Sequence, residues 1–253
     1  MGLSEFFSNF KERQKLRKVE KLTSKLCEKY NQDYERYAAA DELFEIGTYD
    51  ALYGLLKRFT SHVPNVEQDD KEKRYVLSLL YKKGEDVLPP LIDFIKSEDE
   101  IVYPLQLLKK ILGKEETLKV LKELVENFSA EYDRDPSKKI EVIKELSTYK
   151  SPEVGKLIFP FLDDPNDDVV LATIDAFKEI FLDLDEEDRE KIREKLLNIF
   201  LSDEEKPRVE RKILDFFMDL KLKVTGFKKS VAEKLEKPYY LDKKGHIKKL
   251  GMK

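Results

Sequence analysis

The sequence is poor in cysteine, tryptophan, glycine and proline: its 253 residues include one Cys, no Trp, nine Gly and ten Pro. The single cysteine, Cys27, excludes a disulfide within the chain and is typical of a reducing compartment. Glycine and proline are too scarce for a fold built from many short strands and turns. These absences favour a helical protein.

Long apolar segments are also missing. The longest apolar run covers about Leu157 to Leu162, whereas a membrane-spanning helix needs ~20 such residues. The first 30 residues alternate Phe and Leu with Lys and Glu, and they lack the apolar core of a secretory signal. We therefore expect a cytoplasmic protein.

Charged residues, by contrast, are abundant at 40% of the chain, against roughly 25% in ordinary globular proteins. An elongated layer of paired helices, each with one apolar stripe and one wet face, has the surface to hydrate them. The net charge of −4 is uneven, with an excess of basic residues at both ends and an acidic middle. The acidic middle repels a phosphate backbone, which argues against a nucleic-acid partner.

Apolar residues recur in paired helical runs that are separated by Gly, Pro or Asp. In the clearest pair, Gly47 and Thr48 end one run and Asp50 opens the next. Corresponding breaks follow at Gly84, Gly113, Ser151-Pro152 and Asp183–Asp188, and a weaker sixth pair spans residues 207–235. About six pairs at intervals of roughly 30 to 40 residues predict an all-α solenoid of helical hairpins.

Two of these repeats carry a more specific pattern. Arg36-x-x-Ala39-Ala40-x-x-Leu43 with Gly47 and Asp50-Ala51-Leu52, and Asp164-Pro165-x-x-Asp168-Val169-Val170, resemble the HEAT-like repeats of bacteria and archaea. The resemblance covers roughly residues 34 to 220 and implies a right-handed α-α superhelix of the HEAT/ARM type, with about six hairpins and terminal caps. The fifth repeat departs from the pattern, because Leu171 stands where an Arg is usual.

The pattern divides the chain into three segments. Residues 1–32 are expected to form an amphipathic helix that caps the first repeat, residues 33–236 form the repeats, and residues 237–253 are a basic tail or a small hairpin. The basic N-terminal helix could instead lie on an anionic membrane or grip a partner. Asp242 and Gly245 suit a small hairpin turn, and the sequence leaves open whether this segment folds back on the last helices or remains a mobile basic tail.

The sequence offers little for catalysis. It has no phosphate-binding glycine loop, no Gly-x-Ser-x-Gly and no His-Glu-x-x-His motif. His62 and His246 stand apart, and the acidic run Asp183–Asp188 suits the start of a helix better than a calcium loop. We expect no enzyme activity, metal or cofactor. Within the HEAT-like resemblance, a DNA glycosylase or a bilin lyase would be the enzymatic alternative.

A helical-repeat scaffold implies a binding function. The second helices of such hairpins line a concave surface whose side chains are fixed by packing. We expect a monomer that binds a segment of another protein there, with attachment to an anionic membrane or partner through the basic ends as the alternative. The outward positions expected to contact the partner are Tyr53, Lys57, Pro90, Phe94, Lys119, Glu123, Lys156 and Phe159.

Overall fold

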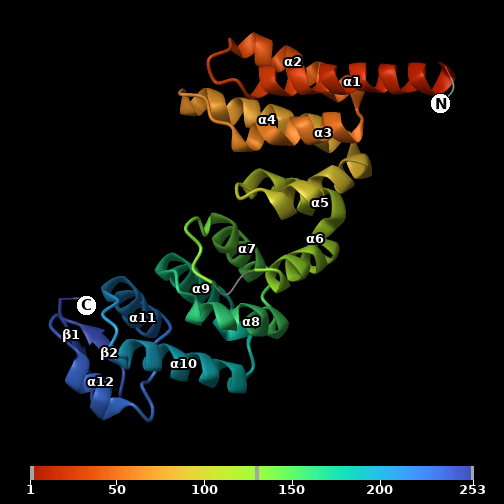
Figure 1. The fold of residues 1–253 in the computed structure, drawn as a ribbon. Helices are drawn as coiled ribbons and strands as arrows, with labels where there is room; N and C mark the ends of the chain where they lie inside the picture. The colour runs from red at the N-terminus through yellow and green to blue at the C-terminus, as the bar shows by residue number, and fades with distance from the viewer. Residues whose placement is uncertain (1–2, 129–130, 252–253) are drawn as a thin grey trace. The chain divides into compact units, whose positions relative to one another are not determined.

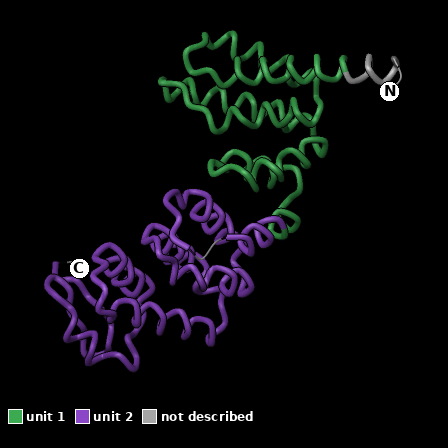
Figure 2. Tube along the Cα trace, in the orientation of Figure 1, with its two compact units in different colours: residues 1–119 green, residues 120–253 purple. Residues whose placement is uncertain are grey.

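The computed structural model describes residues 3–128 and 131–251, and for residues 3–9 and 11 it describes the backbone alone. The described part is mostly helical, with one two-stranded sheet near the C-terminus (Figure 1). The expectation of an all-α chain is confirmed at this level. The chain forms two compact units, Met1–Lys119 and Val120–Lys253 (Figure 2). This boundary falls inside the predicted repeat segment, residues 33–236.

Unit 1 consists of helices arranged largely as hairpins. They are α1 (Leu3–Cys27), α2 (Asp33–Ile46), α3 (Tyr49–Leu56), η1 (Lys57–Thr60), α4 (Val66–Lys82), η2 (Gly84–Val87), α5 (Leu88–Ser97) and the first part of α6 (Val102–Glu126). Within the unit, α2 contacts α3 and α4, and α3 contacts α5.

The break between α2 and α3 has a clear local cause. Gly47 adopts a left-handed conformation with φ of 60°, and its N–H donates to the Leu43 carbonyl, which ends α2. Thr48 then caps α3, because its hydroxyl accepts from the N–H of Ala51. The predicted break at these two residues is confirmed.

Helix α1 packs on the first hairpin with only its C-terminal part. Val19, Leu22 and Leu26 are buried at helical spacing, and α1 contacts both α2 and α3. The described side chains before Val19 are all exposed, among them Phe10 and Leu16. The sequence also assigned Leu3, Phe6 and Phe7 to this amphipathic helix, and their side chains lie outside the described residues.

Helix α6 is interrupted at Gly113, where φ is 75° and ψ is −179°. Residues with side chains rarely adopt this positive φ, so glycine permits the kink. The sequence predicted a break between two helices at this residue, and the break is present. Thr117 follows it and its hydroxyl donates to the Gly113 carbonyl at 2.7 Å, which satisfies one carbonyl at the kink.

Unit 2 is also helical, apart from two short strands near its C-terminal end. Its elements after α6 are α7 (Ser137–Ser147), α8 (Pro152–Ile158), η3 (Phe159–Asp163), α9 (Asp167–Ile180), η4 (Phe181–Asp183), α10 (Glu186–Leu201), α11 (Pro207–Asp219), α12 (Lys228–Lys234), β1 (Tyr239–Leu241) and β2 (Ile247–Lys249). Helix α9 contacts α7 and α11, while α10 contacts α8 and α12. The core of unit 2 includes four almost fully buried rings, Phe177, Phe181, Phe216 and Phe217.

The C-terminal segment forms a folded hairpin. Strands β1 and β2 pair antiparallel, and β1 contacts α12 while β2 contacts α11. In the turn, an Asp242 carboxylate oxygen accepts from the N–H groups of Lys244 and His246, at 2.8 and 2.9 Å. Gly245 supplies the required positive φ of 89°. Of the two C-terminal alternatives, the structure has the hairpin.

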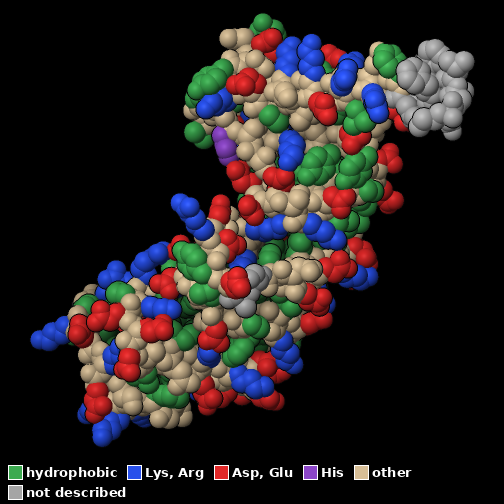
Figure 3. Space-filling model, in the orientation of Figure 1, with side chains coloured by type: hydrophobic (Ala, Val, Ile, Leu, Met, Phe, Trp, Pro, Cys, Tyr) green, Lys and Arg blue, Asp and Glu red, His purple; other side chains and the backbone are tan. Residues whose placement is uncertain are grey.

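The described surface is rich in charge. Acidic and basic side chains are interspersed over each unit on the face drawn in Figure 3. None of the described helices is both long and apolar enough to cross a membrane.

Candidate partner-binding groove

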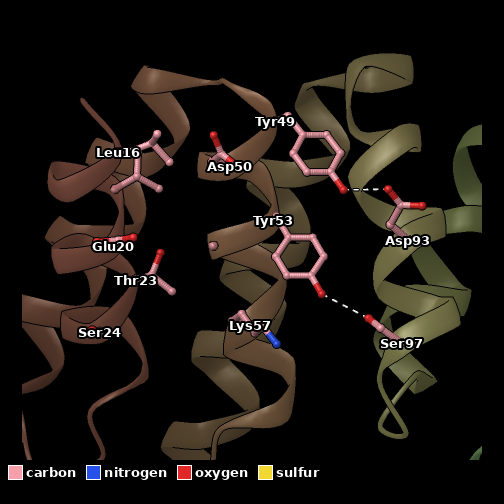
Figure 4. Close-up of a pocket in the computed structure, with 12 residues that line it drawn as sticks. Leu16, Glu20, Thr23, Ser24, Tyr49, Asp50, Tyr53, Lys57, Asp93 and Ser97 are labelled. Carbon is pink, nitrogen blue, oxygen red and sulfur yellow. Dashed lines mark hydrogen bonds between the residues drawn. The ribbon is translucent and has the colours of Figure 1, made fainter. Parts of the chain in front are cut away.

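A groove of about 670 Å³ lies in unit 1 between α1, α3 and α5 (Figure 4). Its α1 wall includes Leu16, Glu20 and Thr23, and its opposite wall includes Asp93 and Ser97 of α5. The floor comes from α3 and the start of η1, and it consists of Tyr49, Asp50, Tyr53, Gly54 and Lys57. The groove thus combines apolar, aromatic, hydroxyl and charged groups, a mixture that suits binding of a polar ligand with apolar parts.

The aromatic part of the floor is a stack along one face of α3. Tyr49 and Tyr53 are one helical turn apart, their ring centroids are 6.2 Å apart and their planes differ by only 16°. The ammonium group of Lys57, one turn further, lies 5.3 Å from the centroid of the Tyr53 ring. The cation thus continues the stack and contributes a cation–π contact.

Both tyrosine hydroxyls fix these rings by bonding to α5. The Tyr49 hydroxyl donates to the Asp93 carboxylate at 2.7 Å, and the Tyr53 and Ser97 hydroxyls are 3.1 Å apart. The hydrogen bond to Asp93 raises the pKa of Tyr49 to about 12, so the hydroxyl remains a donor at neutral pH. The rings are therefore held in place before any ligand arrives, which reduces the entropy lost on binding.

Close packing of α1 against α3 forms the other side of the groove. A Cβ atom added at Gly54 would lie 2.3 Å from the Thr23 hydroxyl oxygen. Glycine at this position therefore permits the approach of the two helices. Beyond this contact Leu16 remains 43% exposed, and it supplies an apolar surface to the groove wall.

The charges of the groove are not balanced. Lys57 forms an ion pair with Glu98 at 2.5 Å, and Asp93 accepts the Tyr49 hydroxyl. Glu20 and Asp50 are exposed, and no described Lys, Arg or His lies within ion-pair distance of either. The groove consequently has an excess of negative charge.

Only two of the residues expected to contact a partner, Tyr53 and Lys57, line this groove. The expectation that Pro90 and Phe94 point outward is wrong, because both are buried and Phe94 is 0% exposed. The inward stripe of α5 is Leu91, Phe94 and Ile95, because α3 covers the side of α5 that carries Phe94. Phe94 therefore lies on the inward face of α5 with Leu91 and Ile95, and Ile92 is only half-buried.

The remaining expected residues lie elsewhere. Lys119 and Glu123 are exposed on α6, where Lys119 pairs with Glu116 at 2.6 Å. Lys156 and Phe159 line a separate cavity of about 200 Å³ in unit 2, beside Asp188 of α10. None of these four residues lines the groove in unit 1.

The sequence missed the residues that give the groove its shape, including Tyr49, Asp93 and Leu16. Tyr49 could have been found, because it precedes Tyr53 by four residues and therefore shares its helix face. Asp93 and Leu16 could not, because they reach the groove from helices that only tertiary packing brings to α3.

The acidic run considered for calcium forms the start of α10. The Asp185 carboxylate accepts from the N–H of Asp188 at 2.8 Å, which caps the helix. Within residues 3–128 and 131–251, no group of three or more His, Cys, Asp or Glu side chains is placed to hold a metal ion.

No family model and no curated protein sequence matches this chain. The resemblance to HEAT-like repeats therefore depends on the repeat residues themselves.

Proposed function

We propose that this chain is an interaction scaffold built from HEAT-like repeats, and that the groove on α3 holds a segment of another protein. In this proposal the hairpins are successive turns of a right-handed α-α superhelix. The chain itself then performs no reaction, and its role is to hold the bound segment.

Contacts between equivalent helices support the repeat architecture. Within unit 1, Arg36 of α2 pairs with Glu72 of α4, 36 residues later. Within unit 2, Arg208 of α11 pairs with Asp168 of α9, 40 residues earlier. Such separations equal one hairpin, as expected when each repeat packs on the next.

The observation that carries the binding function is the fixed tyrosine stack in an open groove. Rigid tyrosines provide a large contact area at a small cost in side-chain entropy, and they are enriched at protein interfaces. The exposed part of Leu16 on the α1 wall provides an apolar contact for the same ligand. A peptide segment matches this mixture of aromatic, apolar and hydrogen-bonding groups.

The proposal is tested by selecting ligands from a displayed library of random 16-residue peptides. We expect peptides that bind the full chain and that lose at least about tenfold in affinity, or 1.4 kcal/mol, when Tyr49 and Tyr53 are both replaced by alanine. Far-UV circular dichroism and thermal melting check that the double variant stays folded. Phe94→Ala is unsuitable for this test, because it would open a cavity in the core.

The matched control is Tyr34→Ala. Tyr34 is 68% exposed on α2 of the same unit and lies outside the groove, so peptide affinity should stay unchanged. Recovery of no peptide that depends on Tyr49 and Tyr53 would refute the proposed binding site.

A further inference from the structure

We infer that the segment held in this groove is basic, so that its Lys or Arg side chains bind the carboxylates beside the tyrosine stack. This inference rests on the proposed function, because it specifies the ligand of the same groove.

Three carboxylates line the groove around the tyrosine stack. Figure 4 shows Glu20 and Asp50 on the α1 side of the two tyrosines and Asp93 on the α5 side. Glu20 and Asp50 are exposed and lack a basic partner among the described residues. Asp93 accepts one hydroxyl, which leaves lone pairs on its carboxylate for a further donor.

The single lysine of the groove does not cancel this charge. Lys57 forms an ion pair with Glu98, whose carboxylate oxygen lies 2.5 Å from its ammonium nitrogen. A cationic ligand would therefore meet three carboxylates and no unpaired cation among the residues that line the groove.

The tyrosine rings independently favour a cationic ligand. An aromatic face attracts cations, and the position of the Lys57 ammonium group 5.3 Å from the Tyr53 centroid shows that this stack accommodates one. An Arg or Lys of the ligand can pack against Tyr49 in the same way while its charge reaches Asp50 or Glu20. The aliphatic part of such a side chain also suits the exposed surface of Leu16.

The same charges oppose the other ligands that a groove of this size could take. Phosphate groups of a nucleic acid or of an anionic lipid, and carboxylates of an acidic peptide, would approach Glu20 and Asp50 against electrostatic repulsion. We therefore assign a basic peptide segment to the groove.

The test uses the peptides recovered from the displayed random library. Peptides that depend on Tyr49 and Tyr53 should be enriched in Lys and Arg relative to the starting library. A synthetic peptide of the recovered sequence should bind the Glu20→Gln, Asp50→Asn double variant about tenfold more weakly than the native chain. Its affinity for the native chain should also fall as salt rises from 0.05 to 0.5 M, because salt screens exposed charges.

The matched control is the Glu45→Gln, Asp86→Asn double variant. Glu45 and Asp86 are exposed acids of the same unit outside the groove, so this variant removes the same net charge and should bind the peptide as the native chain does. Equal weakening by both double variants would show that net charge alone, and not the groove carboxylates, attracts the peptide.

A charge reversal provides the sharpest result. Selection with a Glu20→Lys, Asp50→Lys variant should yield peptides enriched in Asp and Glu. If groove-dependent peptides are recovered without a basic bias, the inference is wrong while the proposed scaffold function stands. If no groove-dependent peptide is recovered from the native chain, both fail.

Discussion

In unit 1 a buried network of charges joins α2 and η1 to α4. In unit 2 the ion pairs between α9 and α11 are exposed, and the buried contacts are mainly aromatic and aliphatic. The unit 1 network centres on Glu72, which is 2% exposed. Arg36 donates to both carboxylate oxygens of Glu72, at 2.8 and 2.7 Å. Arg58, which is fully buried, bonds to Glu72 at 3.1 Å and to Asp69 at 2.8 Å, and Lys73 pairs with Asp69 at 2.9 Å.

Unit 2 has a smaller counterpart between α7 and the start of α9. Lys139 pairs with the buried Asp164 at 3.1 Å. Asp164 also accepts the N–H of Asn166 at 2.9 Å. Around this pair the core depends on rings such as Phe177 and Phe216.

The buried contacts between helices thus depend on charge to very different degrees in the two units. In unit 1 the buried carboxylate of Glu72 pairs with two guanidinium groups, those of Arg36 and Arg58, so removal of Glu72 takes this carboxylate from both. In unit 2 the buried carboxylate of Asp164 pairs with one basic side chain, Lys139, and accepts one backbone N–H. Three substitutions test this difference, in order of decreasing effect.

The largest effect is expected for Glu72→Ala. It would leave the guanidinium groups of Arg36 and Arg58 buried without their shared carboxylate, at a cost of about 3–5 kcal/mol in the free energy of unfolding. Urea unfolding followed by circular dichroism measures this loss. Glu67→Ala on the same helix is the control, because Glu67 is exposed and pairs with Lys71 alone, and its stability should change little. Equal effects of the two variants would contradict a central role for Glu72.

A smaller effect is expected for Lys139→Met in unit 2. Methionine keeps the apolar length of the side chain, and Asp164 keeps the hydrogen bond from the N–H of Asn166. We expect a loss of about 1–3 kcal/mol, measured by the same unfolding experiment. A loss as large as that of Glu72→Ala would remove the distinction between the units.

The smallest of the three effects is the stability that the ionised Asp69 carboxylate contributes and that is lost at low pH. Burial raises the pKa of Asp69, but hydrogen bonds from Lys73, the Val63 N–H and Arg58 outweigh it and lower the pKa to about 2 from a usual 3.8. A carboxyl group whose pKa is lower in the folded than in the unfolded chain stabilises the fold at pH values above its unfolded-state pKa. This stabilisation is lost as the pH falls through the folded-state pKa. The window for this loss is therefore about pH 5 to pH 2.

Asp69→Asn isolates this contribution. The difference in unfolding free energy between the native chain and this variant should shrink by about 1 kcal/mol between pH 5 and pH 2, after allowance for solvent screening. Denaturant unfolding at each pH measures the difference. A difference that stays constant across this range would show that Asp69 does not titrate with a lowered pKa.

The sequence predicted several breaks between helices well, because their signals are local. Glycine with positive φ at Gly47 and Gly113, and the proline at the start of α11, act within a few residues of the break they cause. The buried charge network of unit 1 was harder to predict from the sequence. Arg36 was noted as part of a repeat pattern, but its partner Glu72 lies 36 residues away, and nothing local pairs them.

The candidate groove was predicted only in part, for the same reason. Tyr53 and Lys57 could be assigned to an outward face of α3 from periodicity alone. Phe94 was assigned to the wrong face, because α5 has apolar residues on more than one side and periodicity does not decide which side a neighbour covers.

By itself, the sequence predicted a mostly helical chain and several of the points at which helices begin or end, since these depend on apolar spacing and backbone-breaking residues. Tertiary structure alone decided that α5 buries Phe94 against α3, that Arg36 and Arg58 share Glu72, and that α1 closes the groove beside Tyr49. Each of these depends on the rotation of one helix about its axis against a neighbour distant in sequence. That rotation is set by how two surfaces pack, which a single helix does not encode.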